Sequence, residues 1–81
     1  MSVSFEIYTL YHGRWEMHSR FDQSEEPRAR KEIEVLENDA HIDAVCMVRE
    51  TYNSKTNESR DFVVYNSPWI KKTLAQGVAD L

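Results

Sequence analysis

The chain has 81 residues, of which 41% are hydrophobic and 30% are charged, and its formal net charge is −4 at pH 7. This length fits a single domain with a small core, and the hydrophobic content and mixed charges exclude a disordered chain. The negative charge disfavours a nucleic-acid partner, because binding to phosphates requires clustered Lys and Arg. A lone cysteine, no signal-like start and no long apolar run predict a cytoplasmic protein without a membrane span.

Two strands of a hairpin are predicted in residues 5–21, where apolar and polar residues alternate. The more apolar set occupies the odd positions Phe5, Ile7, Tyr11, Trp15, Met17 and Phe21. A three-residue loop over 11–13 would put Gly13 in the left-handed region and pair odd residues with odd residues. A two-residue loop at His12 and Gly13 would instead set Trp15 beside Leu10 and split the apolar set between the faces. We therefore expect the longer loop, with the odd face inside.

The opposite, even face of this hairpin keeps Tyr8, Leu10 and His18 among charged residues. These three side chains are left without a place in the core. We therefore take them as candidate partner-binding residues.

A helix is predicted after the hairpin, because Asp22 and Glu25 form an approximate capping box and Pro27 falls in the first turn. One apolar stripe follows at helical spacing, with Val35 at its flank: Ala29, Ile33, Leu36 and Ala40. We expect ion pairs of the i, i+4 type on the other side, namely Arg28 with Glu32 and Arg30 with Glu34.

Two further strands are predicted over residues 42–52 and 59–66, joined by a polar loop. The expected facing puts Val45 and Met47 opposite Cys46 and Val48, and Phe62 and Val64 opposite Val63 and Tyr65. Strands that are apolar on both faces require cover on both. One helix can shield only one face.

The remaining segment, residues 67–81, begins with Ser67 as a possible N-cap and Pro68 at the first helical position. Its apolar residues have near-helical spacing: Trp69, Ile70, Leu74 and Val78. It is predicted to be a helix that covers the second sheet face or docks on another molecule. The predicted fold is thus α+β, a four-stranded mainly antiparallel sheet in ββαββ order over residues 1–66, followed by this helical segment.

Catalytic, metal and cofactor sites are not expected. His12, His18, His41 and Cys46 match no metal-ligand spacing, and Cys46 lies within an apolar strand, where a thiol behaves as a small hydrophobe. There is no glycine-rich phosphate loop. The chain is therefore predicted to be no enzyme and to bind neither metal nor cofactor.

The stretches "FEIYTLYHGRWEMHSRF", Ala29 with residues 32–36, and "AVCMVRETYNSKTNESRDFVVY" resemble a group of short alphaproteobacterial-type domains that share a GRW hairpin. The resemblance covers residues 5–65. It implies a ββαββ arrangement, but no activity and no site residues.

The predicted function is that of a small, non-catalytic protein interaction module, an accessory subunit or adaptor, with a homodimer among its forms. The expected partner-binding residues are Tyr8, Leu10, His18, Trp69, Ile70, Leu74 and Val78. The alternative is an acidic regulator of a nucleic-acid-handling machine, or a single-strand binder that stacks bases on Tyr8, Trp15 and the other aromatic residues.

Overall fold

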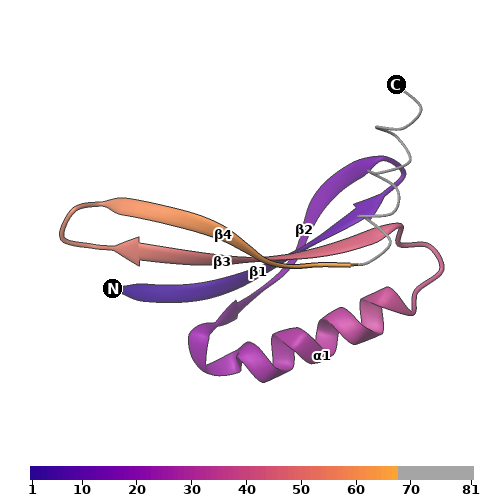
Figure 1. The fold of residues 1–81 in the computed structure, drawn as a ribbon, viewed down its shortest axis with the longest axis horizontal. Helices are drawn as coiled ribbons and strands as arrows, with labels where there is room; N and C mark the ends of the chain where they lie inside the picture. Colours follow the sequence, from indigo (N-terminus) through magenta and orange to yellow (C-terminus); the bar gives the residue numbers. More distant parts are fainter. Residues whose placement is uncertain (68–81) are drawn as a thin grey trace.

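Four strands and one helix form an α+β fold in ββαββ order, as the sequence predicts (Figure 1). The computed structural model describes residues 1–67. The strands form one antiparallel sheet in the order β2-β1-β3-β4. The elements are β1 (Ser2–Tyr11), β2 (Arg14–Asp22), a 3-10 turn (Gln23–Glu25), α1 (Glu26–Glu37), β3 (Ala44–Asn53) and β4 (Glu58–Asn66). Within the described part of the chain, α1 is too short and too polar to cross a bilayer.

The core lies between α1 and one face of the sheet, because α1 packs on that face alone (Figure 1). Ile7 of β1 and Met47 of β3 are fully buried at its centre, on the two central strands. The other core members are Phe5, Ala29, Ile33, Leu36 and Val45. The predicted burial of Phe5, Ile7, Val45 and Met47 and the predicted helical stripe up to Leu36 are therefore confirmed, whereas Tyr11, also expected inside, is 43% exposed at the end of β1.

The predicted capping box forms, but it caps the 3-10 turn that leads into α1, and α1 itself begins at its N-cap Glu25 without a side-chain cap. The Asp22 carboxylate accepts a hydrogen bond from the Ser24 amide, and Glu25 Oε1 accepts one from the Asp22 amide at 3.2 Å. The helix ends at Glu37, so Ala40 falls in the following turn and is exposed, contrary to the predicted stripe. The buried stripe therefore ends at Leu36, about two turns after Ala29.

The ion pairs on α1 also differ from the prediction. Arg28 Nη1 lies 2.7 Å from Glu25 Oε2, and Arg30 Nε lies 3.1 Å from Glu26 Oε2. Both arginines therefore reach back toward the helix start instead of forward to Glu32 and Glu34. Helical side chains point toward the N-terminus, and a glutamate placed before its cation is the more favourable order.

The predicted turn of the first hairpin is wrong. Tyr11 pairs with Arg14 and Leu10 with Trp15, so the loop contains only His12 and Gly13. Both have positive φ, at 50° and 75°, the backbone of a type I′ turn whose twist matches that of the strands. This shorter loop puts Trp15 and Met17 on the face away from α1, where they are 48% and 51% exposed.

Beyond Met17, a β-bulge in β2 shifts the pairing by one residue and restores odd-with-odd pairing. The pairing shifts between Ile7 and Tyr8, so His18 is the extra residue between Met17 and Ser19. Phe21 thereby returns to the core side, opposite Phe5.

A second shift occurs in the pairing of β3 with β4, between Met47 and Val48. Val64 is the extra residue there, so Tyr65 pairs with Met47 on the side of α1 and Val63 pairs with Val48 on the other side. Phe62 pairs with Arg49 and shares the side of Tyr65, whereas the sequence had placed them on opposite faces. Bulges at the two edge strands therefore decide which residues face away from the helix.

Candidate functional site

The face of the sheet opposite α1, here called the open face, carries a contiguous set of apolar side chains. Leu10 lies beside Trp15, Tyr8 lies between Met17 and Cys46, and Val48 lies beside Val63. These seven residues, Tyr8, Leu10, Trp15, Met17, Cys46, Val48 and Val63, are called the apolar patch below. Exposed fractions of 48%, 51% and 58% at Trp15, Met17 and Val63 show that its edges are in contact with solvent. Contiguous apolar surface of this kind marks interaction sites in soluble proteins.

Next to the patch, the open face carries an acidic cluster: Glu6, Glu50 and Asp61, with the single cation Arg20. Arg20 Nη2 lies 3.1 Å from Glu50 Oε1, and Arg20 Nη1 lies 3.9 Å from Glu6 Oε2. Asp61 pairs across the strands with Glu50. Two carboxylates share one guanidinium and a third lies beside Glu50, so this part of the surface carries excess negative charge.

Glu6 is the buried member of the acidic cluster, and it links the cluster to the apolar patch. It is 7% exposed, and the Tyr8 hydroxyl donates a hydrogen bond to its Oε1 at 3.2 Å. Partial burial, followed by the charge of Glu6, raises the pKa of Tyr8 above its usual value. Tyr8 therefore stays a neutral hydrogen-bond donor, which holds the carboxylate in place.

Cys46 lies within the apolar patch and is half-buried. Desolvation by burial raises the pKa of its thiol. A neutral thiol is a weak nucleophile, because the thiolate is the reactive form. The position of Cys46 thus favours a packing role over catalysis.

The three histidines are separated in the fold. His12 lies in the first turn and His41 lies in the loop after α1. The bulge turns His18 toward α1, where its Nε2 is 4.0 Å from Glu32 Oε1, so its predicted position on the outer face is wrong. Among residues 1–67, no three His, Cys, Asp or Glu side chains gather closely enough to hold a metal ion.

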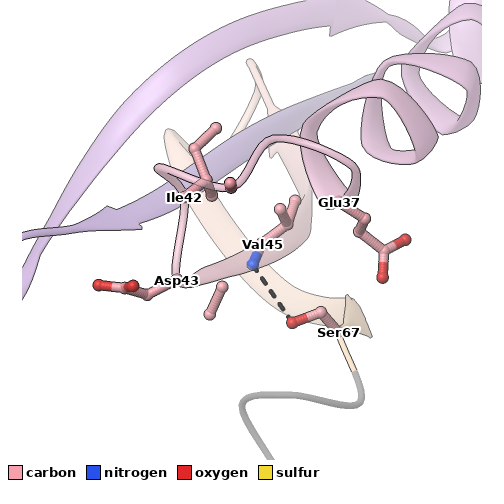
Figure 2. Close-up of a pocket in the computed structure, with 7 residues that line it drawn as sticks. Glu37, Ile42, Asp43, Val45 and Ser67 are labelled. Atoms are coloured by element: carbon pink, nitrogen blue, oxygen red, sulfur yellow. Dashed lines mark hydrogen bonds between the residues drawn. The ribbon is translucent and has the colours of Figure 1, made fainter.

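A hollow with a volume of about 380 Å³ lies where α1 ends and β3 begins. Figure 2 shows the Glu37 and Asp43 carboxylates on opposite sides of it, with Ser67 at its base. The Ser67 hydroxyl accepts a hydrogen bond from the Val45 amide at 3.4 Å, and Glu37 Oε1 accepts one from the Tyr65 hydroxyl at 2.7 Å. The Ser67 hydroxyl and the Glu37 carboxylate are therefore engaged by hydrogen bonds within the fold.

The predicted partner-binding residues do not all lie on one face. Tyr8 and Leu10 lie on the open face as expected, and His18 does not. The other four, Trp69, Ile70, Leu74 and Val78, lie outside the described residues.

Sequence reasoning missed Trp15 and Met17, which extend the apolar patch over β2. It counted both as core residues because it chose the longer loop. The signal that could have found them is the His12-Gly13 pair, since a two-residue hairpin loop needs positive φ at both positions.

Comparisons with protein-family models, with curated proteins and with solved structures find no match for this chain.

Proposed function

We propose that this protein is a non-catalytic interaction module, an accessory subunit or adaptor, that binds a partner protein through the open face. The observation that carries the proposal is the apolar patch. The described residues cover the other face of the sheet with α1 and place no element on this one. Burying large apolar side chains contributes about 1.5–3 kcal/mol each, so Trp15 and Met17 together could supply much of a binding free energy.

The chemistry of the open face also indicates the kind of partner. An apolar surface next to the acidic cluster fits a segment that combines large apolar side chains with Lys or Arg. A cation placed near Glu6 and Glu50 would offset the excess of negative charge, and the apolar side chains would cover Met17 and Val63. Such charge complementarity contributes more to specificity than to raw affinity.

A matched pair of photo-crosslinking variants tests the proposal. A photoreactive amino acid replaces Met17 on the open face or Val35 on α1, which are 51% and 61% exposed. In extract of the source cell, the probe at position 17 should cross-link to a defined protein that the probe at position 35 does not capture. Mass spectrometry identifies the captured protein.

The captured protein is then purified and titrated against the full chain by calorimetry. Met17→Asp should weaken binding at least about tenfold, because a charge would be buried against apolar surface, and Val35→Asp should leave the dissociation constant unchanged. Equal effects of the two substitutions would contradict the assignment of the open face.

A second candidate, an acidic regulator of a nucleic-acid-handling machine, is favoured by the three carboxylates of the acidic cluster. In that case binding to the partner should weaken steeply as salt is raised from 50 to about 500 mM, because exposed charges are screened. Contact through the apolar patch should change little over the same range. Direct stacking of single-stranded nucleic acid on Tyr8 and Trp15 is opposed by the same carboxylates, and anisotropy with a labelled oligonucleotide checks it.

A further inference from the structure

We propose that residues 68–81 of the same chain occupy the apolar patch when no partner is bound, so that a partner must displace them. The displacement rests on the proposed function, whereas occupancy of the patch by residues 68–81 can be tested by itself. Three features support residues 68–81 as the occupant: where this segment starts, how far it can reach, and which residues it contains.

The segment starts from a fixed point beside the patch. The Ser67 amide donates a hydrogen bond to the Val45 carbonyl at 2.9 Å, and Ser67 is 3% exposed. Asn66 pairs with Cys46, which belongs to the patch. The described part of the chain therefore ends beside Cys46, next to the apolar side chains that need cover.

The segment is also long enough to cross the patch. Neighbouring strands lie about 4.8 Å apart, so the path from the end of β4 over β3 and β1 to β2 is about 14 Å. A helix rises about 1.5 Å per residue, so about ten residues of helix would cover this distance, fewer than residues 68–81 provide. A segment joined directly to Ser67 has an effective concentration in the millimolar range, which favours its own patch over that of a second copy in dilute solution.

The composition of the segment complements the open face. Trp69, Ile70, Leu74 and Val78 have near-helical spacing, and Lys71 and Lys72 follow the first two. Large apolar residues with adjacent cations are the combination that the apolar patch and the acidic cluster favour. The hollow at the end of α1, which Ser67 also borders, is less suitable for Trp69 because it offers no aromatic or methionine side chain (Figure 2). Its apolar lining consists of Ala40, Ile42, Ala44 and Val45.

Cys46 supplies a reporter for the test, because it is the only cysteine of the chain and lies within the patch. The rate of its reaction with a bulky maleimide is measured at low micromolar protein for the full chain, Leu74→Asp and Gln76→Asp. Both substitutions add one negative charge, but only the first interrupts the apolar spacing. We expect Leu74→Asp to raise the rate at least about tenfold and Gln76→Asp to leave it within about twofold. Equal rates in all three proteins would overturn the proposal.

A photo-crosslinker in place of Val78, eleven residues beyond Ser67, then locates the segment. Mixing isotopically labelled and unlabelled chains separates cross-links within one chain from those between chains. Cross-links to Met17 or its neighbours within one chain are the expected result. Cross-links between chains would identify a second copy as the occupant, and cross-links to residues 37–43 would identify the hollow at the end of α1. Either result, or no cross-link, overturns the proposal.

Binding of the partner protein captured by the probe at position 17 allows the two proposals to be tested separately. The Leu74→Asp variant should bind this partner more tightly than the unmodified chain does. The fold-decrease in the dissociation constant should equal the fold-increase in the reaction rate of Cys46. If Met17→Asp abolishes partner binding but Cys46 reacts equally in all variants, the proposed function stands and this inference fails. If Cys46 is protected but no partner binds the open face, the inference stands and the proposed function fails.

Discussion

The two faces of the sheet are formed by alternate residues of the same strands, yet they differ in what covers them. On one face, Ile7 and Met47 are fully buried beneath α1. On the other face, Tyr8 and Met17 lie side by side and Met17 is half exposed. The residue types overlap, so hydrophobicity alone does not separate core from binding surface. What separates them is the position of one helix and the register of two edge strands.

The largest difference between the faces should appear in a pair of methionine substitutions. Met47→Ala removes a fully buried side chain and leaves a cavity, so it should lower the free energy of unfolding by about 2–5 kcal/mol. Met17→Ala removes a half-exposed side chain, so it should cost about 1 kcal/mol or less. Urea unfolding with unchanged slope measures both. Similar losses would mean that the two faces are equally buried in solution.

The turn that assigns Trp15 and Met17 to the open face can be tested at Gly13. Its φ of 75° lies in the left-handed region, and an added Cβ would meet no atom within 4 Å. Gly13→Ala should therefore cost about 1–2 kcal/mol through the backbone alone. Gly13→Asn should cost less, because Asn adopts this conformation more readily. Thermal or urea unfolding in which both variants match the unmodified protein would contradict the two-residue turn.

The ion pairs of the acidic cluster should contribute less to the free energy of unfolding than the turn at Gly13 does. Arg20→Gln removes the cation that Glu6 and Glu50 share, and a half-exposed arginine pair is worth about 0.5–1 kcal/mol. Arg30→Gln on the outside of α1 breaks the pair with Glu26 and should cost about 0.3–0.5 kcal/mol. Unfolding in low and high salt measures both losses. If Arg20→Gln lowers the free energy of unfolding no more than Arg30→Gln does, the ion pair of Arg20 with the buried Glu6 does not stabilise the fold beyond an exposed helix pair.

On the covered side, a further prediction concerns pH, and the titration involved has no effect on stability at neutral pH. Burial, followed by the hydrogen bond to Glu37, raises the pKa of Tyr65 from 10.0 to about 12. Because the folded protein holds this proton more tightly than the unfolded chain, the contribution to stability is complete below pH 10. It is lost as the pH rises toward 12. The tyrosinate absorbance should show a late step that Tyr65→Phe removes and Glu37→Gln shifts to lower pH. A titration unchanged in Tyr65→Phe would contradict this environment.

The regular parts of the molecule could be predicted from the sequence. The capping box at Asp22 and the helical spacing of Ala29, Ile33 and Leu36 located α1, because these signals act between residues close in the chain. The alternation in β1 identified Phe5 and Ile7 as core residues for the same reason. On the open face, Tyr8 and Leu10 followed directly from that alternation.

The sequence by itself thus determined the elements, their order and the inside face of β1, since local spacing and capping encode them. Only the tertiary structure decided the faces of Trp15, Met17, His18 and Phe62. A hairpin can close through a two- or a three-residue loop, and a bulge can restore the register afterwards, so these choices depend on pairing across strands. One residue of slip exchanges core and surface. That is why Trp15, the largest side chain of the first hairpin, lies on the candidate binding surface instead of in the core.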